Sequence, residues 1–160
     1  MSNQSLNVFR QPLKLFSTSP LTGFHRDGYC RTSPLDRGNH AIAGIVTDEF
    51  LDFSAAQGND LRQGGAGLTA GCKWCLCTGR WLEAFRAFEA GRVGIGAVPK
   101  VDLEATEESA LRGGGVGLEV LRRFAVEGQG QGQQQQQQVV NGNGHVNGVN
   151  GVNGVNGTGQ

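Results

Sequence analysis

Three of the four cysteines in this 160-residue chain lie within six residues of one another. They are Cys72, Cys75 and Cys77, and the fourth, Cys30, lies far away in the sequence. Cys72 and Cys75 have the C-x-x-C spacing of half a zinc site, but no second C-x-x-C and no H-x-x-x-H completes it. Cys30 with His25 or His40 is the best remaining pair, and it has no metal-ligand spacing. We therefore predict a chain without a metal ion or cofactor.

The same cysteines could serve redox chemistry, nucleophilic chemistry or packing. A redox C-x-x-C pair belongs at the start of a helix, where the helix dipole stabilises a thiolate. Here Cys72 and Cys75 enter a predicted strand, and the next helix begins only after Cys77. Metal or redox chemistry is the least favoured interpretation. Two others are favoured over it: reduced cysteines can pack as small apolar side chains, or a thiol can act as a ligand or nucleophile.

Charged residues surround the fourth cysteine. Arg26 and Asp27 precede Cys30, and Arg31 follows it directly. A thiol beside arginine and histidine can be held as a reactive thiolate. The alternative is a tight turn at Asp27 and Gly28, with both arginines in solvent.

These patterns define a candidate site. The candidate catalytic residues are Cys30, His40, Cys75 and Cys77. The candidate ligand-binding residues are Arg26, Asp27, Arg31, Asn59, Asp60, Arg80 and Glu104. Together they predict a cleft for a small anionic or carbonyl ligand, attacked by a thiolate. The alternative is a non-catalytic interaction or structural domain with buried reduced cysteines.

Several of these polar residues also have a structural interpretation. Asn59 and Asp60 follow a predicted helix, where such side chains cap carbonyl groups and turn the backbone. Glu104 lies near the end of an apolar strand, so a buried carboxylate there would need a partner such as Arg80. His40 just before a strand could be a base or simply a hydrogen-bonded side chain.

Hydrophobic periodicity and turn residues define the elements that must position the site. Residues 7–40 show no sustained period and contain three prolines, which predicts an irregular region. After it we expect strands over 41–46, 74–77 and 98–105, and helices over 48–57, 78–90 and 118–126, with a brief helix after Thr106. Thr47 is the expected cap of the first helix. The order predicts a small α+β domain, with α/β as the second choice.

Composition divides the chain at Gly128 and excludes several partners. Residues 1–127 hold every charged residue, whereas 128–160 contain only Gly, Gln, Val, Asn, one Thr and one His. We therefore predict a globular domain over 1–127 and a disordered tail over 128–160. The 14 basic and 14 acidic residues balance, so no nucleic-acid partner is expected. No apolar run spans a membrane and no secretory signal begins the sequence, which predicts a cytoplasmic protein. No oligomeric state is predicted.

Separated blocks of sequence resemble the DUF2237 family. They are residues 20–24 (PLTGF), 26–28 (RDG), 30–32 (CRT), 36, 38 and 40, 47–51 (TDEFL), 58–61 (GNDL), 74–77 (WCLC), 80–81 (RW) and 103–106 (LEAT). The resemblance implies a small single soluble domain of a family without an established activity.

The chain departs from the family pattern at four positions. Phe16 and Ala43 stand where the family leads us to expect cysteines, Cys72 where we expect Asp, and Glu107 where we expect His. The resemblance therefore implies that any histidine chemistry at position 107 is lost here. It also makes metal binding by a larger cysteine set less expected.

Overall fold

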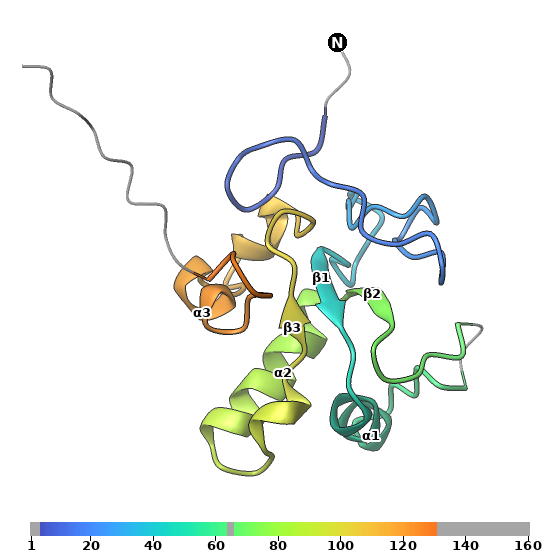
Figure 1. The fold of residues 1–160 in the computed structure, drawn as a ribbon, viewed down its shortest axis with the longest axis vertical. Coiled ribbons are helices and arrows are strands. Elements are labelled where there is room, and N and C mark those ends of the chain that lie inside the picture. The colour runs from blue at the N-terminus through green and yellow to red at the C-terminus, as the bar shows by residue number, and fades with distance from the viewer. Residues whose placement is uncertain (1–3, 64–65, 131–160) are drawn as a thin grey trace, which may run out of the picture.

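A three-stranded antiparallel sheet lies at the centre of the molecule (Figure 1). The computed structural model describes residues 4–63 and 66–130. The strands are β1 (Ile42–Ile45), β2 (Lys73–Leu76) and β3 (Lys100–Val101), in the order β2-β1-β3. The helices are α1 (Asp48–Ala56), α2 (Thr78–Glu89) and α3 (Leu118–Arg123), with 3₁₀ turns at η1 (Ile95–Ala97) and η2 (Glu108–Leu111). This arrangement confirms the predicted α+β class.

Alternation along the strands divides the sheet between two clusters of buried side chains. Trp74 and Leu76 of β2 pack into the main core, whereas Cys75 points into a smaller cluster. Ala43 of β1 lies opposite Cys75 in the register and belongs to the same smaller cluster. The predicted division of β2 into a tryptophan face and a cysteine face is confirmed for these three residues.

A side-chain cap fixes the start of α1, and a buried tryptophan positions α2. Thr47 accepts a hydrogen bond from Phe50 N (3.0 Å) and donates one to Gly96 O (2.6 Å), which confirms the predicted cap of α1. In α2, Trp81 is fully buried and its indole N–H donates to Pro99 O (3.0 Å). The helix therefore packs against the chain that enters β3.

Two elements are shorter than the sequence predicts. β3 covers two residues because Asp102 turns the chain: its Oδ1 accepts from the N–H groups of Glu104 (3.0 Å) and Ala105 (3.3 Å). α3 ends at Arg123 because the following backbone bonds to β3 instead. Val101 N donates to Phe124 O (2.8 Å), and Val126 N donates to Val101 O (2.9 Å).

The irregular N-terminal third lies against the end of the sheet opposite α1 (Figure 1). It forms no regular strand, so turns, isolated bridges and some side chains satisfy its backbone. Asn7 is almost fully buried; its Oδ1 accepts from Phe9 N (3.0 Å) and Gln11 N (3.1 Å), and its Nδ2 donates to Glu104 O (3.1 Å).

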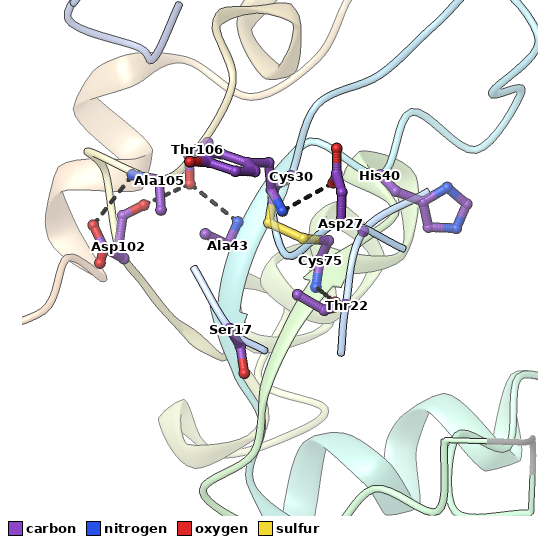
Figure 2. Close-up of a disulfide and its surroundings, with 12 residues drawn as sticks. Ser17, Thr22, Asp27, Cys30, His40, Ala43, Cys75, Asp102, Ala105 and Thr106 are labelled. Atoms are coloured by element: carbon purple, nitrogen blue, oxygen red, sulfur yellow. Dashed lines mark hydrogen bonds between the residues drawn. A yellow bond between two sulfur atoms is a disulfide. The ribbon is translucent and has the colours of Figure 1, made fainter. Parts of the chain in front are cut away.

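A disulfide between Cys30 and Cys75 joins this third to β2 (Figure 2). Both cysteines are buried, in the cluster that holds Ala43. Thr22 Oγ1 accepts a hydrogen bond from Cys75 N (2.8 Å), so a second contact joins the N-terminal third to β2 at the same place. One interpretation of the sequence expected these cysteines to be reduced; the folding of residues 7–40 over β2 instead brings the two sulfur atoms within bonding distance.

The folded part of the chain continues past Gly128. The Gln129 side chain accepts from Leu103 N (2.6 Å) and donates to Asp102 Oδ1 (3.0 Å). The predicted boundary at Gly128 therefore cuts through these contacts. Residues 131–160 lie outside the described residues, so the disordered tail stays a prediction. Within 4–63 and 66–130, no helix is long and apolar enough to cross a membrane.

Removing the disulfide should destabilise the domain. A Cys30→Ala/Cys75→Ala variant should lose about 2–4 kcal/mol of unfolding free energy. The reason is that the disulfide restricts the unfolded chain between two cysteines 45 residues apart, and the variant removes this restriction. Urea unfolding with and without reductant measures the loss, and Cys72→Ser is the matched control. Equal stability of the wild type and the double variant would contradict a structural role.

Two truncations separate the tail from the domain. A chain ending at residue 130 should keep the full unfolding free energy. A chain ending at residue 127 should lose roughly 1 kcal/mol, because Leu103 N and Asp102 lose their Gln129 partner. Gln129→Ala in the full chain should reproduce that loss in thermal or urea unfolding. No difference between the two truncations would show that Gln129 contributes nothing.

Candidate functional site

Three side chains form a continuous chain of contacts beside the start of α2. Cys77 Sγ lies 3.0 Å from His40 Nε2, and His40 Nδ1 lies 2.6 Å from Asp36 Oδ1. The other carboxylate oxygen of Asp36 accepts from the backbone N–H of His40 (2.8 Å). Since a carboxylate can only accept, Nδ1 donates to Asp36 and Nε2 is left facing the sulfur. A thiol, an imidazole and a carboxylate are thus joined by successive hydrogen-bond contacts.

A turn in the chain places Asp36 and His40 on the same side. Asn39 has a positive φ of 48°, and its N–H donates to Asp36 O (3.1 Å). The Asp36 side chain is fully buried, whereas the His40 side chain is 35% exposed to solvent. The carboxylate therefore fixes the ring, and the ring stays accessible.

Gly38 allows the sulfur and the ring to approach this turn. A Cβ at this position would lie 2.7 Å from His40 Cε1 and 3.0 Å from Cys77 Sγ. Any larger residue would push the imidazole or the thiol out of place. Close approach, rather than a positive φ, explains this glycine.

Cys77 occupies the junction between β2 and α2. It follows Leu76, the last residue of the strand, and is the N-cap of the helix. Thr78 is tied to the His40 turn, because Thr78 N donates to Asn39 O (3.0 Å) and Asn39 Nδ2 donates to Thr78 Oγ1 (3.0 Å). Among the described residues, the backbone N–H groups of Gly79 and Arg80 find no acceptor.

The contact with the sulfur changes the protonation of the histidine. The pKa of His40 is raised from an ordinary value of 6.5 to about 9, and the hydrogen bond with Cys77 is the largest cause. Burial acts in the opposite direction, and the hydrogen bond and charge of Asp36 add to the rise. The imidazole is thus held in its protonated form at neutral pH.

Surface hollows open on both sides of this pair. Cys77 lines a hollow of about 660 Å³ with Arg37, Arg80 and Arg86. His40 lines a second hollow of about 490 Å³ with Arg26 and Trp74. Cys77 therefore borders a hollow with room for a small molecule.

The structure separates the four candidate catalytic residues into two pairs. His40 and Cys77 meet directly, and each lines a hollow. Cys30 and Cys75 are joined by the buried disulfide, so neither carries a free thiol here. In Figure 2 the His40 ring points away from that disulfide. Cys72, the other free cysteine, lies 3.6 Å from Thr69 Oγ1.

The charged residues around Cys30 mainly hold their own turn. Asp27 pairs with Arg31 (2.6 Å) and accepts from Tyr29 N (3.2 Å). Arg26 donates to Gly23 O (2.8 Å), and its guanidinium lies 5.0 Å from the centre of the Trp74 ring. Of these predicted ligand-binding residues, only Arg26 shares a hollow with His40.

The remaining candidates are spread over the surface. Asn59 Nδ2 donates to Ser54 Oγ (3.0 Å) at the end of α1, and Asp60 accepts from Arg62 N (3.0 Å) in the next turn. Glu104 pairs with Lys14, so the partner suggested by the sequence, Arg80, is wrong. Glu104 thus contacts the N-terminal third through Lys14. Arg80 instead pairs with Glu83 within α2 (3.1 Å) and lines the Cys77 hollow.

Sequence reasoning missed Asp36 as a site residue. Asp36 is four residues before His40 and was noticed only as part of the family-like blocks. The spacing Asp-x-Gly-x-His, with a glycine between an acid and a base, is the signal that could have identified it. In the described part of the chain, no three or more His, Cys, Asp or Glu side chains are placed so that they could hold a metal ion.

Titration of His40 tests the contact with Cys77. By NMR the ring should stay protonated until the pH approaches about 9. Cys77→Ser should move that pKa down toward 6.5, because the largest raising contribution is removed. The protonated His40 ring stabilises the folded state. This stabilisation is fully present below pH 6.5 and is lost as the pH rises through about 9. His25 serves as the internal reference, and a His40 pKa unchanged by Cys77→Ser would contradict the coupling.

Comparison with known proteins supports the resemblance seen in the sequence. No curated protein sequence matches this chain. The family model described as "Uncharacterized protein conserved in bacteria (DUF2237)" matches residues 6–125. This range covers the sheet, all three helices and the Asp36–His40–Cys77 contacts. The chain therefore belongs to the DUF2237 family.

Proposed function

We propose that this protein is a thiol-dependent acyl-transfer enzyme that acts on a small carbonyl substrate. Cys77 is the nucleophile, His40 is the acid and base, and Asp36 is a positioning residue. The observation that carries the proposal is the line of contacts from Cys77 to His40 (3.0 Å) and from His40 to Asp36 (2.6 Å). A nucleophile, a base in reach and a group that orients the base are the parts this chemistry needs.

The first step forms a thioester on Cys77. The proton shared by the pair lies on His40 Nε2, as the raised pKa of His40 favours, and the Cys77 sulfur attacks the carbonyl carbon of the substrate. The C–S bond forms, the bond to the leaving group breaks, and His40 returns the proton to that group. The raised pKa of His40 suits this step, because the imidazolium that must donate the proton is favoured.

The second step releases the acyl group to water. A water molecule gives one proton to His40 and attacks the thioester carbon. The C–S bond breaks, and the proton returns to the Cys77 sulfur. The net reaction consumes one water and yields a carboxylic acid and the free leaving group.

The start of α2 supplies donors for the oxygen that becomes negative during both steps. Gly79 N–H and Arg80 N–H have no acceptor among the described residues and lie two and three residues after the nucleophile. Unpaired N–H groups at such a position can stabilise an oxyanion. Loss of one oxyanion donor typically costs roughly 10²–10³-fold in rate.

Asp36 acts through the ring rather than on the substrate. Its carboxylate binds both the ring N–H and the backbone N–H of His40, which fixes the tautomer and the orientation of the imidazole. The Asp36 side chain is fully enclosed, so it makes no contact with a molecule in either hollow.

Competition between the two free cysteines tests the nucleophile. At pH 6, iodoacetamide should modify Cys77 at least about tenfold faster than Cys72, because His40 can hold the Cys77 proton and leave a thiolate. His40→Asn should bring Cys77 to the rate of Cys72, and Asp36→Asn should shift its pH profile. Peptide mass spectrometry measures both rates, with Cys72→Ser as the matched control.

Acylation provides the functional readout. p-Nitrophenyl acetate should leave one acetyl group per chain on Cys77, and Cys77→Ser should abolish this adduct while Cys72→Ser leaves it. If Cys77 reacts no faster than Cys72 and no acetyl adduct forms on it, the proposed enzyme is refuted and the interaction-domain interpretation remains.

A further inference from the structure

The hollow that contains Cys77 carries an excess of positive charge. Four arginines line it, Arg37, Arg80, Arg86 and Arg112, against a single acid, Glu83. The whole chain, by contrast, has equal numbers of basic and acidic residues. The basic side chains are thus concentrated around the free thiol.

Two of these arginines are free to bind something else. Arg80 pairs with Glu83 (3.1 Å), and Arg112 pairs with Glu108. Arg37 and Arg86 make no salt bridge and no side-chain hydrogen bond within the described residues. Their guanidinium groups remain available as bidentate donors for a carboxylate or a phosphate.

A run of glycines that also lines this hollow leaves room for a ligand. Gly113, Gly114 and Gly115 line the hollow there and contribute no side chains. Gly113 and Gly114 have positive φ values of 62° and 78°, and a Cβ on Gly115 would lie 2.3 Å from Ala110 O. This backbone therefore disfavours side chains that could fill the space beside the arginines.

We infer that the substrate carries an anionic group, a carboxylate or a phosphate, held by Arg37 and Arg86 while its carbonyl carbon lies at Cys77. This inference rests on the proposed function, since it names the substrate class of that same site. Arg37 follows Asp36 in the turn and lines the same hollow as Cys77. Arg86 lies on α2 nine residues after Cys77, about 13 Å along the helix axis, and its side chain leans back toward the start of the helix.

The arginines also act on an anionic substrate before it reaches the sulfur. Positive charge around the entrance would also raise the local concentration of such a substrate.

A pair of alkylating reagents tests the inference. Iodoacetate and iodoacetamide deliver the same carbon to a thiol, but only iodoacetate is negatively charged. We expect the iodoacetate-to-iodoacetamide rate ratio at Cys77 to exceed that at Cys72 by about tenfold at low salt. High salt should reduce this preference, because the arginines are solvent-exposed.

Variants show which charges matter. Arg37→Gln/Arg86→Gln should bring the ratio at Cys77 close to that at Cys72, and the ratio cancels any change in thiol reactivity that both reagents share. Arg10→Gln/Arg92→Gln removes two positive charges away from the hollow and is the matched control. An unchanged ratio in Arg37→Gln/Arg86→Gln, or an equal fall in the control, overturns the inference.

Protection experiments at constant ionic strength identify the anion. Slowing of Cys77 alkylation by succinate but not inorganic phosphate assigns a carboxylate, and the reverse assigns a phosphate. Protection by neither counts against an anion site. Fast iodoacetamide modification of Cys77 with no charge preference refutes only this inference, whereas slow modification of Cys77 by both reagents refutes the proposed enzyme as well.

Discussion

The attachment of the irregular N-terminal third to β2 is the constraint on which the rest of the structure depends. This segment has no strand ladder of its own, so its position is set by a few strong contacts. The Cys30–Cys75 disulfide and the Thr22 bond to Cys75 N fasten it at one end of the sheet. The turn that follows then delivers Asp36 and His40 to the start of α2. Without this attachment the imidazole and the Cys77 thiol would be separate features of the surface.

The strand-to-helix junction gives neighbouring cysteines different roles. Within β2 the side chain of Cys75 points into the small buried cluster and forms the disulfide. Two residues later the strand has ended, and Cys77 caps α2 beside His40. A short strand that runs directly into a helix thus separates a sulfur held in a disulfide from a free one. The unpaired N–H groups of the first helical turn come with the same junction.

Electrostatics of the site follow from local grouping rather than from overall charge. The chain is neutral as a whole, yet arginines from the His40 turn, from α2 and from the segment after η2 converge on one hollow. His40 adds a further positive charge close to the sulfur, because its pKa is raised by Cys77 and Asp36. A thiol in these surroundings is suited to negatively charged partners.

Local sequence patterns determined most of the secondary structure of this protein. Thr47 before two acids and an apolar stripe determined α1, and the alternation of Trp74, Cys75 and Leu76 determined the two faces of β2. The length of α3 could not be predicted this way, because hydrogen bonds between Val101 and residues distant in sequence end it. The early end of β3 depends on the side chain of Asp102, which turns the chain within an otherwise apolar run. Gln129 escaped notice because its partners lie 26 and 27 residues earlier.

The sequence by itself also determined that His40 and Cys77 were candidates, because their side chains carry the right chemistry wherever they lie. Only the tertiary structure decided which thiol meets which base. Cys30, Cys75 and Cys77 have the same thiol group, and nothing local distinguishes the pair that forms a disulfide from the one that stays free. That choice depends on how residues 7–40 cross the sheet, and a crossing without regular structure leaves no periodicity in the sequence.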